Sequence, residues 1–150
     1  MRFVARGFTL IELMVVVAIA AILMGLALPS FKSFIEGQRV KAAASDFAMA
    51  AIYARSEAIK RNGEVGVVAA ATIWKDGWSV KAGAVSLSEQ AGYPALTMTS
   101  AVTEIVYLGS GRLKEQALVS GLQITGEGGS FARCVTFDLS GLPKSRLGNC

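Results

Sequence analysis

The residue of this sequence with the most chemistry attached to it is Glu12, a single carboxylate at the start of a long apolar run. The sixteen residues that follow it, Leu13 to Leu28, carry no charge and no hydrogen-bonding side chain. Counted from Phe8, the apolar span has 21 residues, enough for an α-helix to cross the roughly 30 Å hydrocarbon core of a bilayer. A charge at depth in a membrane costs about 2 to 3 kcal/mol or more. Glu12 therefore needs a partner, and a partner implies assembly.

The other residue types argue against catalysis. Histidine is absent, which removes the commonest general base and the commonest metal ligand. The sequence has no nucleophile–base pair, no paired carboxylates in a catalytic context and no phosphate-cradling glycine loop between a strand and a helix. We therefore predict that the chain is not an enzyme and uses neither a cofactor nor a metal ion. A membrane-anchored enzyme is the weakest alternative.

The two cysteines, Cys134 and Cys150, lie late in the chain, and the second is its last residue. An exported domain sits in an oxidising compartment, so a disulfide between them is expected. It would close a 17-residue segment and stabilise the fold by about 3 kcal/mol. A metal or redox role is the alternative, but two cysteines without histidine partners make a weak zinc site.

One long helix must position Glu12 and the apolar run. We expect it to continue past Pro29, although proline inside a helix removes a backbone hydrogen bond and kinks it. Lys60 and Arg61 complement the C-terminal end of a helix, and Asn62-Gly63 supplies a left-handed stop. The predicted helix has 54 residues, from Phe8 to Arg61, and a length of roughly 80 Å. Its second half carries a narrow stripe of mostly small apolar residues at three- and four-residue spacing, suited to packing on a sheet: Val40, Ala43, Ala44, Phe47, Ala51, Ala54 and Ala58.

Beyond Gly63 the apolar pattern changes to a period of two, which predicts β-strands. Ile73-Trp74 and Trp78–Lys81, on either side of the turn 75–77, indicate a hairpin or a bulged continuation. The segment 84–93 is polar and contains glycine, so we predict a loop there. The other predicted strands are 65–69, 96–99, 104–108, 121–125 and 131–139, the last turning at Ser140-Gly141 into a C-terminal tail.

The N-terminal motif Gly7-Phe8-Thr9-Leu10-Ile11-Glu12, with a short basic leader before it and an apolar helix to Pro29 after it, resembles the class III signal of type IV pilins and type II secretion pseudopilins. In that family an aspartyl prepilin peptidase cuts after the glycine and methylates the new amino terminus. The resemblance implies cleavage between Gly7 and Phe8, with Phe8 as the N-methylated first residue. It also implies that Glu12 pairs with the N-terminal amine of a neighbouring subunit.

An ordinary secretory signal peptide and a plain membrane anchor are the alternatives for the same stretch. The apolar run exceeds the usual 7 to 15 residues of a signal peptide's hydrophobic region. A glutamate stands at its start, and no clean small-x-small cleavage site follows Leu28. These features favour the pilin interpretation.

The second half of the chain narrows the resemblance. Residues 53–62, the valine-rich strand and Trp74-Lys-Asp-Gly-Trp78 resemble the GspH/FimT branch of minor pilins. Cys134 to Gly141 and the terminal Cys150 look more like the FimT and FimU minor pilins of type IV pili than the secretion pseudopilin GspH. For four further residues we predict no binding or catalytic role. Trp74 and Trp78 are expected to pack in a core rather than form a ligand platform, and Arg55 and Glu57 to belong to a solvated helix face.

The resemblance implies an α+β, type IV pilin-like lollipop: a long N-terminal helix, half in the membrane and half amphipathic, packed on an antiparallel β-sheet domain. The expected segments are a prepilin leader at 1–7, a transmembrane and filament-core helix at 8–28, the amphipathic half of the helix at 29–62 and a β-rich globular domain at 63–150.

The function implied is that of a minor pilin of a type IV pilus, a structural and assembly subunit processed by prepilin peptidase. It would insert in the bacterial inner membrane with its ectodomain in the periplasm, and later lie in a pilus at the cell surface. Its implied partners are other major and minor pilins, the prepilin peptidase and the inner-membrane assembly platform. The alternative is a GspH-type minor pseudopilin of a type II secretion system.

A DNA-binding role is a further hypothesis. FimT-type pilins are associated with DNA binding in natural transformation, through basic residues in a Gly-Arg-x-Arg-like segment near the C-terminus. Here that place is occupied by Gly141 to Arg146, which lacks the first arginine and carries a lysine shifted by two. Weak, salt-sensitive binding of double-stranded DNA by Lys144 and Arg146 would follow, and solubilising charges on a surface tail are the alternative. The further candidates are Arg133, Arg112 and Lys114.

Overall fold

The structure, a computed structural model, describes residues 8–115 and 121–150. It divides into two units, Met1–Ile35 and Glu36–Cys150. Helix α1, Leu10–Arg61, contributes to both, and it is continuous across residue 29. It begins two residues later than predicted and ends at the predicted residue. Asn62, at φ 48°, is the left-handed stop, and Gly63 N donates to Ala58 O at 3.1 Å.

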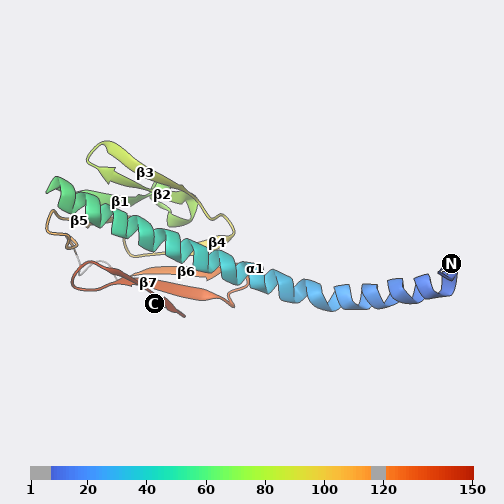
Figure 1. Cartoon of the computed structure of the whole chain (residues 1–150). Helices are drawn as coiled ribbons and strands as arrows, with labels where there is room; N and C mark the ends of the chain where they lie inside the picture. Colours follow the sequence, from blue (N-terminus) through green and yellow to red (C-terminus); the bar gives the residue numbers. More distant parts are fainter. Residues whose placement is uncertain (1–7, 116–120) are drawn as a thin grey trace, which may run out of the picture. The chain divides into compact units, whose positions relative to one another are not determined.

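The second unit contains two separate four-stranded antiparallel sheets. The first has the order β3-β2-β1-β5, with β1 Val65–Ala69, β2 Gly77–Ala82, β3 Val85–Ala91 and β5 Glu104–Tyr107. The second has the order β4-β6-β7-β8, with β4 Leu96–Thr99, β6 Leu122–Gly126, β7 Ala132–Phe137 and β8 Pro143–Leu147. Two short 3-10 turns, η1 Ala70–Thr72 and η2 Trp74–Asp76, connect β1 to β2. Figure 1 shows the second half of α1 lying along both sheets.

The core of this unit lies between the helix and the two sheets. The predicted small-residue stripe from Val40 to Ala58 is confirmed, since each of its seven members is at most 1% exposed. Small side chains let the helix backbone approach the sheets closely. Phe47 stands at the centre, with edge-on contacts to Trp74 and Trp78 at ring-centroid distances of 5.2 and 5.6 Å. Trp74 Nε1 donates to Val102 O at 2.8 Å. Both tryptophans are buried, so the packing interpretation is confirmed.

Most predicted strands are present, and three predictions were wrong. The segment 84–93 contains strand β3 instead of a loop, because it pairs with β2 as an edge strand whose side chains are mostly exposed on both faces. Ile73-Trp74 is not a strand, since Trp74–Asp76 forms a 3-10 turn. The tail after Gly141 contains strand β8, which pairs with β7 at five positions and is the edge strand of the second sheet.

Candidate functional site

Glu12 closes the first turn of α1 in a capping box. Thr9 N and Thr9 Oγ1 both donate to Glu12 Oε2, at 2.9 and 2.8 Å, and Glu12 N donates to Thr9 Oγ1 at 3.3 Å. A threonine before the helix and a glutamate three residues later satisfy two orphan backbone donors in this way. Sequence reasoning missed this contact, although Thr9-x-x-Glu12 is its signature. Within residues 8–115 and 121–150 no cation forms an ion pair with the carboxylate.

The helix beyond Glu12 presents apolar side chains in all directions. From Phe8 to Met24 every large apolar side chain is more than half exposed. By length and composition the helix is suited to crossing a membrane. A helix that is apolar all round is stable only when lipid or other apolar helices surround it. The cleavage position predicted after Gly7, like the rest of the leader at 1–7, lies outside the described residues, whereas Phe8 is the first described residue.

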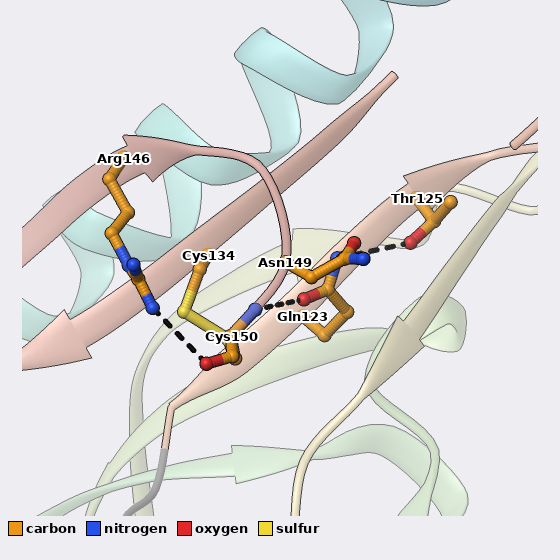
Figure 2. The surroundings of a disulfide bond; sticks show 6 residues. All are labelled: Gln123, Thr125, Cys134, Arg146, Asn149 and Cys150. Carbon is orange, nitrogen blue, oxygen red and sulfur yellow. Dashed lines mark hydrogen bonds between the residues drawn. A yellow bond between two sulfur atoms is a disulfide. The ribbon is translucent and has the colours of Figure 1, made fainter. Parts of the chain in front are cut away.

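The C-terminal segment is held at the second sheet by a disulfide and by a glutamine. Cys134 of β7 and Cys150 form the predicted disulfide. Cys150 N donates to Gln123 Oε1 at 2.6 Å, and Gln123 Nε2 donates to Asn149 Oδ1 at 3.1 Å. Figure 2 shows both interactions beside the disulfide, with Gln123 reaching from β6 to the end of the chain. The sequence carries no signal for this role of Gln123, because its partners lie 26 and 27 residues away.

The strand register divides the predicted basic residues between two faces of the second sheet. Lys144 lies opposite Thr136 and Arg146 lies opposite Cys134, so the two cations share the face that carries the disulfide. Arg133 is one residue out of step with Cys134 and lies on the other face. Its Nη1 donates to Ser145 Oγ at 3.3 Å. The structure therefore brings Lys144 and Arg146 together and does not bring Arg133 to them.

The two remaining basic candidates lie in the segment that follows β5. Lys114 Nζ pairs with a Glu64 carboxylate oxygen at 2.9 Å, and this hydrogen bond raises the pKa of Lys114. Arg112 lies beside the β7–β8 turn: a Cβ placed on Gly141 would come within 3.6 Å of its Cα. The two clustered cations have partners as well. Lys144 Nζ lies 3.4 Å from Asp138 Oδ2, and Arg146 Nη2 donates to Cys150 O at 3.1 Å.

The turn between β7 and β8 is built around Asp138. Its Oδ1 accepts hydrogen bonds from Ser140 Oγ, Ser140 N and Leu142 N, at 2.5, 2.9 and 3.1 Å. These bonds, the Ser140 hydroxyl first, lower the pKa of Asp138 to about 2. Tyr107 Oη, fully buried on β5, donates to Gly141 O at 2.8 Å, and its burial raises the pKa of Tyr107. This hydrogen bond ties the turn to the first sheet.

Two charged residues of α1 are structural, and the solvated-face interpretation of them was wrong. Arg55, half-buried, donates through Nε to Gly111 O at 2.8 Å. Glu57 is 8% exposed and forms ion pairs with Arg61 at 2.8 Å and Lys60 at 3.4 Å. The hydrogen bond from Arg61 is the main cause of the lowered pKa of Glu57. Across the described ranges, no group of three or more His, Cys, Asp or Glu side chains could hold a metal ion.

Comparison with known proteins gives two family matches. The family described as "Type II transport protein GspH" matches residues 43–141, and the "Prokaryotic N-terminal methylation motif" matches residues 2–28. No curated protein sequence matches the chain.

Two solved structures are similar to this chain, both of the type IV minor pilin FimU of Pseudomonas aeruginosa strain PAO1. The crystal form in space group P21 has a TM-score of 0.62 at 22% identity and covers 77% of this chain and 92% of that one. The form in space group P65 has a TM-score of 0.58 at 22% identity, with coverages of 72% and 91%. At this identity the likeness concerns the fold: a long N-terminal helix packed on antiparallel sheets, as expected from the sequence.

Proposed function

This chain belongs to the GspH family, whose model matches residues 43–141, and we propose that it is a minor pilin, a structural subunit of a type IV pilus. The observation that carries the proposal is the apolar helix. Its side chains are exposed on every side, and at its start stands one carboxylate, Glu12, that forms no ion pair with a described residue. Such a surface requires a membrane before assembly and neighbouring helices after it.

Packing between helices is the proposed mechanism of assembly. Ala18, Ala20, Ala21 and Gly25 are small and allow another helix to approach closely. A neighbouring N-terminal amine would neutralise Glu12, whose Oε2 is already hydrogen-bonded to Thr9 and whose charge still needs a cation. Other major and minor pilins are the partners that this mechanism needs.

Processing is the step that would create the amine. The match of residues 2–28 to the N-terminal methylation motif supports cleavage between Gly7 and Phe8 by a prepilin peptidase. The subunit would wait in the inner membrane, with residues 36–150 in the periplasm, until an assembly platform adds it to the pilus. The disulfide is consistent with an oxidising compartment.

The capping box makes a sharp test of the role of Glu12. Glu12→Gln keeps an oxygen that can accept from Thr9, and glutamine is a normal partner in a capping box, but the negative charge is lost. Glu12→Ala loses both. If the charge pairs with an amine, each variant should insert in the membrane normally and enter sheared pili about tenfold less, or worse, by immunoblot. If the cap alone matters, Glu12→Gln should assemble like the wild type, and the pairing role would be refuted.

A secretion pseudopilin is the second candidate, because the matching family is described by type II transport. The two functions differ in what a deletion abolishes. Loss of surface pili with normal secretion supports the pilus role, and loss of type II secretion with normal pili supports the alternative.

DNA binding by the C-terminal segment stays a prediction. Its support is that Lys144 and Arg146 lie on one exposed face of the second sheet. The partners of these cations, Asp138 and the Cys150 carbonyl, reduce what they can offer a phosphate backbone. Two phosphate contacts would give weak binding that salt abolishes.

A further inference from the structure

The second unit contains a cavity that the proposed function does not use. It has a volume of about 200 Å³ and lies between α1 and the β2–β3 hairpin. Helix residues Asp46, Met49 and Tyr53 line one side, and Trp78 of β2 and Gln90 of β3 line the other. We call it the Asp46 pocket.

Asp46 places a partly buried carboxylate in this pocket. Tyr93 Oη donates a hydrogen bond to Asp46 Oδ2, and the Tyr93 ring stacks on Trp78 with centroids 6.2 Å apart. Burial and the contact with Asp46 raise the pKa of Tyr93 to about 12, so the phenol stays protonated and keeps donating. No Lys or Arg among the described residues forms an ion pair with Asp46. A partly desolvated carboxylate with one neutral donor favours a cation as its second partner.

On the helix side the pocket is bordered by two exposed, largely apolar side chains. Met49 and Tyr53 both line it and are 57% and 39% exposed, and Ile52, 49% exposed, lies on the same side of α1 next to Tyr53. Large apolar side chains that gather around a polar centre are typical of protein interfaces, where a desolvated centre carries most of the binding energy. A small free cation would leave these side chains exposed to water, so the occupant is a protein side chain.

Arginine is the side chain that fits both features. Its aliphatic stem can pack against Met49, and its planar guanidinium can pair with the carboxylate and stack on the face of Tyr53. It is also more weakly hydrated than a lysine ammonium, which lowers the cost of entering a partly buried site. A single carboxylate, in contrast, is a poor site for a divalent metal ion.

We propose that the Asp46 pocket is the receptor for an arginine side chain of a neighbouring filament subunit. The neighbour rests on the proposed function, whereas the pocket's preference for a guanidinium is a property of the isolated chain. The two ideas therefore fail in different experiments.

The test uses the full chain in detergent micelles and the two indole N–H signals of its NMR spectrum. The probe is N-acetyl-arginine amide, and N-acetyl-citrulline amide is its uncharged match in shape. Trp74 is an internal reference, because it lies outside the pocket and its Nε1 is already bonded to Val102 O. The arginine probe should shift the Trp78 signal in a saturable way, leave Trp74 unchanged and bind at least about tenfold more tightly than citrulline.

Four variants assign the effect to the carboxylate. Asp46→Asn should weaken the arginine probe at least about tenfold, whereas Asp76→Asn, an exposed carboxylate outside the pocket, should not change it. Tyr93→Phe removes the hydrogen bond but keeps the charge, and should retain binding. Ser88→Arg places a guanidinium on the pocket wall from exposed strand β3 and should block the probe. It serves as the test if Asp46→Asn does not fold.

The proposal is overturned if Trp78 does not respond, if citrulline shifts it equally, or if Asp46→Asn and Ser88→Arg both bind arginine like the wild type. In cells, Asp46→Asn should insert in the membrane normally and enter sheared pili several-fold less than Asp76→Asn. Equal incorporation of the two variants overturns the neighbouring-subunit part. A failure of the Glu12 experiment would leave the NMR result standing.

Discussion

Removing the disulfide tests whether the C-terminal segment is held mainly by its covalent link. In the double variant Cys134→Ser/Cys150→Ser, the non-covalent contacts of the C-terminal segment remain, among them the β7–β8 ladder, the Gln123 bond to Cys150 N and the Arg146 bond to Cys150 O. None of these restricts the unfolded chain. The disulfide does, because it joins two residues 16 positions apart.

The size of the effect follows from that separation. Closing a loop of this length removes unfolded-state entropy worth about 3 kcal/mol at 25 °C. For a unit of the size of Glu36–Cys150, this corresponds to a fall in Tm of about 12 °C. The serine at position 134 adds to the loss, because Cys134 is fully buried and a hydroxyl there would need a hydrogen-bond partner.

Urea unfolding of the full chain in detergent measures this loss. Trp74 and Trp78 both lie in the core of the second unit, so their fluorescence reports its unfolding and not that of the apolar helix. We expect the double variant to lose 2 to 4 kcal/mol. Gln123→Ala is the matched control, because it removes the non-covalent clamp and keeps the disulfide; it should cost about 1 kcal/mol. A loss below about 1 kcal/mol in the double variant would refute the reasoning, and so would a loss in Gln123→Ala that exceeds the loss in the double variant.

Two further predictions concern the β7–β8 turn. Tyr107→Phe leaves the Gly141 carbonyl without its buried donor and should cost about 1 to 3 kcal/mol in the same urea assay; a change below about 0.5 kcal/mol would contradict the role of this bond. Asp138 has a folded pKa of about 2 against an ordinary value of 3.8, so its contribution to stability is present above pH 4 and is lost as the pH falls from about 4 to 2. Asp138→Asn should lack this pH-dependent component. The Tm of the variant and of the wild type is measured between pH 2 and 6, and a constant difference between the two Tm values over this range would refute the prediction.

The helix was predictable because its signals are local. The stripe from Val40 to Ala58 repeats at helical spacing, and every member is buried in the structure. Asn62 ends the helix through its own backbone conformation. The cysteine pair was equally predictable, since two cysteines allow a single pairing within one chain.

Two of the four edge strands, β3 and β8, could not be read from the sequence for a physical reason. A strand shows a period of two only when one of its faces is buried. Strands β3 and β8 are mostly exposed on both faces, so their residues carry no alternation. The sequence also carries no signal for the pairing register of β7 and β8. This register alone decides that Arg133 and Arg146 lie on opposite faces of the sheet.

The contacts that organise the sites join residues far apart in the chain. Tyr107 reaches Gly141 over 34 positions, and Tyr93 reaches Asp46 over 47. Neither pair has a motif, because only the packing of α1 and the two sheets brings them together. Glu12 is the exception, since the apolar run that makes its charge costly follows it directly and was recognised in the sequence; its capping partner Thr9 is also a sequence neighbour but was overlooked.

The two halves of α1 show how a helical pattern separates folding from assembly. From Val40 to Ala58 the stripe of seven mostly small apolar side chains occupies one narrow side, and the chain itself buries it. From Leu13 to Met24 they occupy every side, and the described residues of the chain bury none of the large ones. A helix that is apolar beyond what its own fold covers needs partners outside the chain. The same criterion singles out Met49, Ile52 and Tyr53, which are apolar and exposed. Two of them, Met49 and Tyr53, line the pocket with Asp46, whose carboxylate forms no ion pair with a described residue.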